Sequence, residues 1–196
     1  MNNGNGVNIY NRLFWGWLLI SFNIYIGGFN ILCPAIGIFI VYSNLIELPL
    51  EPWKKKYFMI SAYSAGILSV IELFRAVSDY TAIYWTWISF LSTGAMLAFT
   101  IMTIEIVKDS IARWVKDRNV VISKAYSEKN WRYYQKAFTA TYSIFMLIII
   151  FADYNEEFLA VGVFVGIVSF ILNIIMISSF WNLYKITQNV NVRISK

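Results

Sequence analysis

The longest run of the sequence without a charged residue is the apolar segment Phe158–Tyr184. It exceeds the roughly 20 residues that a helix needs to cross the hydrocarbon core of a bilayer. A second uncharged segment, Thr81–Ile104, is also long enough to span. A soluble fold would need polar residues on the outer faces of such helices, and long stretches here have none. The sequence therefore predicts an α-helical integral membrane protein.

The composition agrees with a membrane location. Hydrophobic residues make up 59% of the chain and charged residues only 14%, whereas soluble domains are about 45–50% apolar and about 25% charged. The sequence has no histidine, which removes the commonest general base and metal ligand. The single cysteine, Cys33, excludes an internal disulfide and a multi-cysteine metal site. We therefore expect neither a metal nor a cofactor.

The charged residues divide the chain into six apolar blocks. These blocks are residues 13–27, 31–46, 57–78, 81–104, 137–152 and 158–184. The first two hold only about 15 residues each, or roughly 22 Å of helix, against a hydrocarbon core of about 30 Å. They form either two short spans or one re-entrant hairpin. The prediction is a single transmembrane domain over residues 1–196, an all-α bundle of about six helices.

The positions of Lys and Arg predict the orientation of the bundle. Basic residues gather at Arg12, at Lys54–Lys56, in 108–136 and in 185–196, while the alternate connections are acidic. The positive-inside rule places the basic side in the cytoplasm. A re-entrant hairpin returns to the side that it left, so four or six crossings give the same orientation. We expect a plasma-membrane protein with both termini in the cytoplasm.

The sharpest candidate binding site lies near the end of block 57–78. Glu72, Arg75 and Asp79 are spaced three and four residues apart, which places them on one helix face. A charged pair in the outer part of the hydrocarbon core is costly unless it faces protein or water. One interpretation is a polar site that opens outward and holds an ion or small solute. The other, which we favour, is that Arg75 snorkels to the outer headgroups and Glu72 neutralises it.

The segment Phe158–Tyr184 contains a stripe of small and polar residues. Gly162 and Gly166 are followed on the same face by Ser169 and Asn173. Small residues four apart let helices approach closely, and an asparagine in the membrane usually bonds to a neighbouring helix. Packing is the favoured interpretation, and a binding role for Asn173 is the alternative.

A similar stripe marks the segment Thr81–Ile104. Its members are Ser89, Thr93, Met96, Thr100 and Thr103. Serine and threonine hydroxyls can bond to the preceding turn of their own helix, so this stripe requires no ligand.

Residues 105–136 form the one long polar stretch, with eight Lys/Arg and four Asp/Glu. Tryptophan and tyrosine residues are interleaved with these charges. Nucleic-acid binding is disfavoured because the stretch is tied to the membrane at both ends. We predict a basic amphipathic cytoplasmic connection that contacts anionic lipid headgroups. A cytoplasmic protein partner is the competing hypothesis.

The opening segment carries a family resemblance. Phe14-Trp15-Gly16, the turn Gly28-Phe29-Asn30-Ile31-Leu32 and the run Ile36–Ile40 resemble the first hairpin of small uncharacterised membrane proteins of Gram-positive bacteria. In that family the turn reads Gly-Phe-Asp-Ile-Leu-Pro-Asp. Here Asn30 stands in place of the acid, and the proline, Pro34, comes one position late. The resemblance implies a membrane hairpin and no particular activity.

Two functional hypotheses follow from the sequence. The leading one is a non-enzymatic membrane protein that acts through a partner protein or by self-assembly into a homo-oligomer. The alternative is a small-solute or ion transporter component. In size and number of spans the chain is similar to the six-helix substrate-binding subunits of vitamin uptake systems, but it lacks their early Ala-x-x-x-Ala motif. An enzyme is disfavoured because no catalytic signature is found.

The predicted topology can be tested by cysteine labelling. Cysteines introduced at Asn119 and Asn189 should react only with a reagent that enters the cytoplasm, because both positions belong to the basic side. A cysteine at Asn155 should react with an impermeant reagent added outside. Labelling of Asn119 from outside would contradict the orientation.

Overall fold

The computed structural model describes residues 5–22, 25–26, 29–30, 34–73, 82–118, 128–151 and 156–194. Six helices account for most of them. They are α1 (Asn5–Ser21), α2 (Pro34–Leu45), α3 (Pro52–Leu73), α4 (Ala82–Arg118), α5 (Glu128–Phe151) and α6 (Glu156–Ile194). Two strands of two residues each, β1 (Tyr25–Ile26) and β2 (Phe29–Asn30), pair antiparallel between α1 and α2. The predicted all-α bundle of six helices is confirmed.

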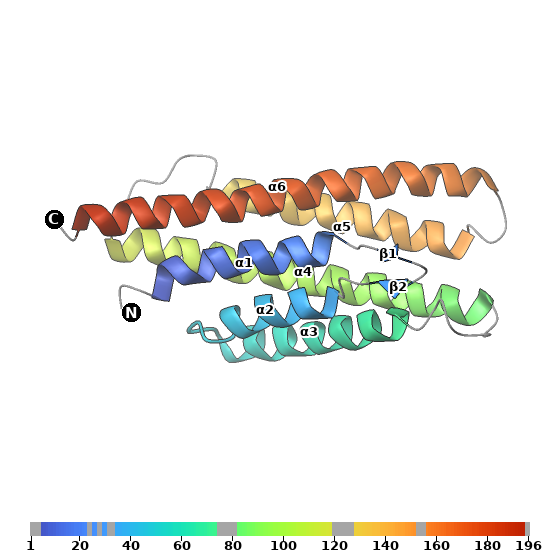
Figure 1. The fold of residues 1–196 in the computed structure, drawn as a ribbon, viewed down its shortest axis with the longest axis horizontal. Coiled ribbons are helices and arrows are strands. Elements are labelled where there is room, and N and C mark those ends of the chain that lie inside the picture. Colours follow the sequence, from blue (N-terminus) through green and yellow to red (C-terminus); the bar gives the residue numbers. More distant parts are fainter. Residues whose placement is uncertain are drawn as a thin grey trace.

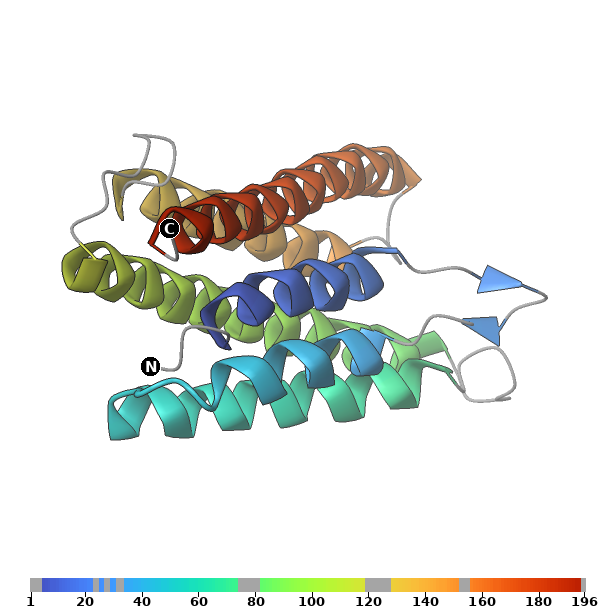
Figure 2. The same cartoon turned by 60° about the vertical axis from the view of Figure 1, so that its left-hand side comes forward.

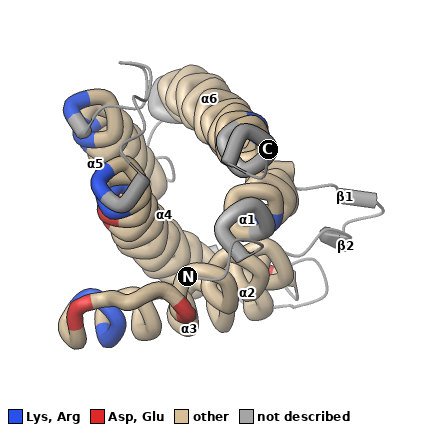
Figure 3. Tube along the Cα trace, turned by 90° about the vertical axis from the view of Figure 1, so that its left-hand side faces the viewer, with Lys and Arg blue, Asp and Glu red and all other residues tan. Residues whose placement is uncertain are grey.

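The helices form a closed ring. Each helix packs against its neighbours in sequence, and α1 also packs against α6, which joins the two ends of the chain (Figure 3). Successive helices run in opposite directions, and both termini lie at the same end of the bundle (Figures 1 and 2). The turn formed by β1 and β2 lies at the opposite end (Figure 1). We call the end that carries the termini the basic end, because the blue Lys and Arg positions gather there (Figure 3).

Three helices are long and apolar enough to cross a membrane. The qualifying segments are Tyr84–Lys116, Lys129–Phe151 and Val161–Asn189. Large apolar side chains also point outward from the bundle, such as Phe39, Val163 and Phe164, which are each more than 60% exposed. Outward apolar faces of this extent suit a lipid environment rather than water. The protein is therefore a membrane protein.

Several helices extend beyond the apolar blocks that predicted them. The first helix begins at Asn5 instead of Leu13, and α3 begins at Pro52 instead of Tyr57. Likewise, α4 continues past Ile104 to Arg118. Charged residues such as Lys, Arg and Glu are good helix formers, so a helix continues where its apolar segment ends. The predicted connection 105–136 thus includes the end of α4 and the start of α5, and residues 119–127 lie outside the described part.

The first two helices are short, as predicted, with 17 and 12 residues. They cross at two glycines, Gly16 and Gly37, which the sequence analysis did not single out. A Cβ atom added at Gly37 would lie 2.9 Å from the backbone nitrogen of Ile20 and against the carbonyl oxygen of Gly16. The two backbones therefore touch directly, and this contact holds the short helices together where their length provides little packing area.

The glycine crossing predicts a sharp difference between glycines. Gly37→Ala should lower the free energy of unfolding by about 1–3 kcal/mol, because the new methyl group overlaps backbone atoms that cannot rotate away. Gly66→Ala is the matched control, because nothing lies within 4 Å of a Cβ atom at that position. Alanine is the better helix former, so this control should be neutral or slightly stabilising. Unfolding in mixed micelles provides the measurement, and equal effects of both substitutions would contradict the close contact.

Candidate functional site

A cavity of about 530 Å³ lies between the helices, toward the end away from the termini. All six helices contribute to its wall. The lining residues are Ile20 and Ser21 of α1, Pro34 of α2, Ser69 and Glu72 of α3, Ser89, Ser92, Thr93 and Met96 of α4, Thr141, Tyr142, Phe145 and Ile149 of α5, and Gly166, Ser169, Phe170 and Asn173 of α6. A void that every helix borders is a feature of the whole bundle rather than of one loose contact.

The wall of this cavity is rich in hydroxyl groups, supplied by serine, threonine and tyrosine. Several of these groups are deeply placed, since Ser69 and Ser92 are only 4% and 5% exposed. Glu72 is half-buried and is the charged side chain among the described lining residues. The cavity thus combines many hydrogen-bonding groups with one carboxylate.

Two of the predicted site residues meet in this cavity. Glu72 reaches it from α3 and Asn173 from α6, although the sequence analysis treated them as separate features. Arg75 and Asp79, the other two predicted residues, lie outside the described residues. The structure therefore adds a relation between Glu72 and Asn173 that residue spacing alone could not provide.

Asn173 is the centre of a hydrogen-bond network at the base of the cavity. Its side-chain oxygen accepts a bond of 3.0 Å from Trp17 Nε1 of α1, and its side-chain nitrogen donates to the Ser169 carbonyl at 3.0 Å. The side chains of Tyr142 and Thr100 extend the network, because Tyr142 interacts with Asn173, Ser169 and Thr100. The prediction that Asn173 bonds to a neighbouring helix is confirmed.

The two glycines on the Asn173 face differ in their surroundings. A Cβ atom at Gly162 would lie 3.2 Å from Ile148 of α5, so this glycine permits close packing as predicted. Gly166 has nothing within 4 Å of such an atom and borders the cavity instead. The packing interpretation is therefore wrong for Gly166, where the small residue leaves space open.

The hydroxyl stripe of α4 is divided between the cavity and the core. Thr93 donates to the Ser89 carbonyl at 2.7 Å and Thr100 to the Met96 carbonyl at 2.8 Å, so the predicted bonds to the preceding helix turn are confirmed. Ser89, Thr93 and Met96 line the cavity, whereas Thr100 and Thr103 are fully buried beyond it. The Thr103 hydroxyl has no hydrogen-bond partner in the described part of the chain.

A layer of aromatic rings closes the bundle on the basic side of the cavity. It consists of Trp17, Phe58, Phe99, Trp131 and Phe180, from α1, α3, α4, α5 and α6, each at most 1% exposed. The rings form one continuous chain, in which Phe58 stacks on Phe99 at 5.6 Å, Phe99 on Trp17 at 6.4 Å, Trp17 meets Phe180 edge-on at 5.9 Å, and Phe180 stacks on Trp131 at 6.3 Å. We call this set the aromatic layer. Aromatic pairs at such separations add about 0.5–1.5 kcal/mol each beyond the area that they bury.

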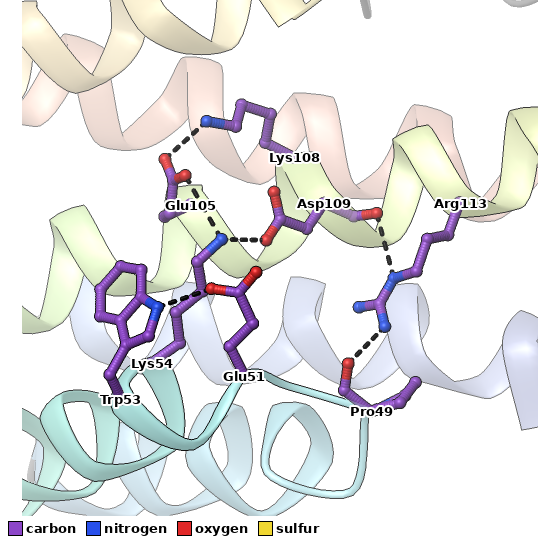
Figure 4. Close-up of polar contacts among 8 residues, drawn as sticks. All are labelled: Pro49, Glu51, Trp53, Lys54, Glu105, Lys108, Asp109 and Arg113. Atoms are coloured by element: carbon purple, nitrogen blue, oxygen red, sulfur yellow. Dashed lines mark hydrogen bonds and ion pairs between the residues drawn. The ribbon is translucent and has the colours of Figure 1, made fainter.

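An ion-pair cluster joins α3 to α4 on the other side of the aromatic layer (Figure 4). Lys54 of α3, only 8% exposed, donates a short hydrogen bond to Asp109 and lies 3.7 Å from Glu105. Lys108 balances the second carboxylate, with its Nζ 2.7 Å from Glu105 Oε2. Two cations and two carboxylates therefore neutralise one another in a partly buried position. Arg113 adds a bond to the Pro49 carbonyl, which ties the loop before α3 to the same helix.

The surroundings of Lys54 shift its pKa upward. Burial opposes the charge and by itself lowers the pKa, but the hydrogen bond to Asp109 and the nearby carboxylates outweigh it and raise the pKa above its ordinary value of 10.5. The sequence analysis assigned Lys54 only to a cytoplasmic loop. It missed the cluster because its partners lie on another helix and no local spacing relates them.

The Lys54 cluster predicts unequal effects at adjacent lysines. Lys54→Met should destabilise the protein by about 1.5–3 kcal/mol, because it removes charged hydrogen bonds and leaves Asp109 without its cation. Lys55→Met is the matched control, since the Lys55 side chain is exposed and such substitutions usually stay within about 0.5 kcal/mol. The double variant Lys54→Met with Asp109→Asn should recover part of the loss. Equal unfolding free energies for the two single variants would contradict the cluster.

The raised pKa of Lys54 also predicts how this difference depends on pH. The stabilisation is fully present below the pKa of the unfolded lysine and is lost as pH rises through the higher folded pKa. The gap in stability between the natural protein and Lys54→Met should therefore be constant from neutral pH to about pH 10 and narrow only above it. A gap that closes near neutral pH would show that another group supplies the stabilisation.

Comparison with known proteins provides no relative. No family model, curated protein or solved structure matches this chain. The resemblance of the opening hairpin to small membrane proteins of Gram-positive bacteria therefore stays a prediction. The cavity, the aromatic layer and the ion-pair cluster are the features on which a functional proposal can rest.

Proposed function

We propose that this protein binds a small polar solute in the cavity and acts as a non-enzymatic, solute-binding component of membrane transport. This was the second of the two hypotheses from the sequence. The observation that supports it is the gathering of hydroxyl, amide and carboxylate groups from all six helices around one space. The bundle is otherwise apolar, so this concentration of polar groups needs an explanation.

The cost of burying polar groups supports a solute-binding role. A polar group buried without a hydrogen bond costs about 1–3 kcal/mol on protein scales, so a cavity of this kind holds water or a polar ligand. Polar and ionisable residues inside a membrane bundle commonly mark substrate pathways. The volume of about 530 Å³ also falls within the range of roughly 300–1,000 Å³ that is usual for small-molecule sites.

The proposed topology has six crossings with both termini in the cytoplasm. Successive helices run in opposite directions, and the turn between α1 and α2 lies at the end away from the termini (Figure 1). That arrangement supports two short crossings for α1 and α2 rather than a re-entrant hairpin. With the basic end in the cytoplasm of a plasma-membrane protein, the cavity belongs to the outer half of the bundle, and solute enters from outside.

In this proposal the aromatic layer and the ion-pair cluster close the inner side. The Trp17 indole belongs to the aromatic layer and also donates to Asn173 in the cavity wall. A solute that competes for Asn173 therefore acts directly on a ring of the layer. This hydrogen bond is the connection through which solute binding would loosen the inner closure.

A second candidate function is action through a partner protein or by self-assembly, the leading hypothesis from the sequence. An apolar groove of about 350 Å³ between α2 and α3 favours it. Its wall includes the exposed side chains of Phe39, Tyr63 and Ile67. This groove is where a helix of a partner or of a second copy would dock. A protein that works only through this groove would show no solute response in the following experiment.

Thermal stabilisation by solutes tests the proposed binding. A panel of amino acids, polyols, nucleosides and organic cations is screened against the purified full-length protein in neutral detergent. A bound solute at about a hundredfold excess over its Kd should stabilise the protein by about 2.7 kcal/mol. Thr141→Val and Ser92→Ala each remove a hydroxyl from the cavity wall and should weaken this stabilisation.

The control for this screen is Thr103→Val. Thr103 is buried on the same helix as Ser92 but does not line the cavity, and its hydroxyl has no partner in the described residues. Its replacement should leave both stability and the solute response unchanged. A solute response that is reduced equally by Thr103→Val and Ser92→Ala would place binding outside the cavity. The absence of any response across the panel would count against the transport proposal.

A further inference from the structure

A second, chemically different pocket lies between α4 and α5 at the basic end. It measures about 600 Å³ and is bordered by side chains from both helices. Its lining residues are Lys108 of α4 and Arg132, Gln135, Lys136, Thr139 and Ala140 of α5. The residues of α5 are spaced three and four apart, so they occupy one face of that helix. The pocket is independent of the solute cavity, because the two share no lining residue.

The charge of this pocket is positive. Three of its described lining residues are cations and none is a carboxylate. Glu105 neutralises Lys108 through the ion pair of 2.7 Å, whereas Arg132 and Lys136 are exposed side chains on the same face. Gln135 and Thr139 add hydrogen-bonding groups between them. An anion with several oxygen atoms is the ligand that fits this combination, since arginine and lysine are the usual partners of phosphate.

The position of the pocket points to a lipid phosphate. Trp131 and Tyr133 lie on the same stretch of α5, and Lys129 lies over the Tyr133 ring; tryptophan and tyrosine typically mark the headgroup level of a bilayer. Beyond Lys136, the same helix face continues through Ala140, Ile144 and Leu147, of which the last two are 46% and 56% exposed. A cationic pocket followed by an exposed apolar stripe matches a phospholipid, with a charged headgroup and an acyl chain.

We propose that the pocket of Lys108, Arg132 and Lys136 binds the phosphate of an anionic phospholipid, whose acyl chain lies along Ala140, Ile144 and Leu147. Basic pockets between membrane helices on the cytoplasmic side are suited to such headgroups. The sequence predicted only diffuse lipid contact over residues 105–136. The structure assigns that contact to one face of α5 and to one residue of α4.

Native mass spectrometry of the full-length protein tests this site. The probe is short-chain phosphatidylglycerol, titrated against the delipidated protein in neutral detergent, with phosphatidylcholine of the same chain length as the comparison. The double variant Arg132→Gln with Lys136→Gln should weaken phosphatidylglycerol binding on the order of tenfold to thirtyfold. Ala140→Phe should weaken it as well without any change of charge, because it fills the pocket.

The control for charge is the double variant Lys55→Gln with Lys56→Gln. These exposed lysines lie on α3 and do not line the pocket, and charges that are remote from the bound phosphate are screened by salt. Binding should stay close to that of the natural protein. An equal loss in this control, or equal retention of phosphatidylcholine, would overturn the site. Displacement of the lipid by the same concentration of glycerol phosphate would show that the pocket takes a free phosphate instead.

Discussion

The rest of the structure depends on the aromatic layer. Helices in a membrane satisfy their own backbone hydrogen bonds, so what decides their arrangement is how side chains pack between them. Here five rings from five helices form one continuous chain, and each ring is almost fully buried. Because the layer crosses the bundle, it separates a polar space on one side from an ion-pair cluster on the other. Neither feature could be kept dry or wet independently without it.

The polar features on the two sides of this layer follow different rules. The ion pairs at Lys54 are satisfied from within the protein, because each cation has a carboxylate. The cavity is lined by hydroxyl groups that bond mostly to their own helices and retain capacity for further bonds. The first arrangement is what a structural contact requires, and the second is what a binding site requires. The Trp17–Asn173 hydrogen bond links the aromatic layer to the site.

Much of the fold could be predicted from the sequence because lipid imposes a strong rule on it. Charged residues interrupt the apolar blocks, and each block became one helix. The ends of the helices could not be predicted in this way, because α3 and α4 continue through lysine and glutamate residues that are good helix formers in water. The pairing of Lys54 with Asp109 was also hidden, since it depends on how α3 and α4 pack. For the candidate site, Glu72 and Asn173 were identified separately, and only the ring of helices brings them to one cavity.

The contact between Gly16 and Gly37 has a consequence for how this sequence can change over time. In most core contacts, a larger residue on one side can be accommodated by a smaller residue on the other. At this crossing the atoms in the way belong to the backbone of the facing helix, and no exchange of side chains can make room. Neither glycine can be replaced first, and no second substitution rescues the loss. The pair is therefore an isolated position in sequence space, which drift leaves only by moving the helices apart.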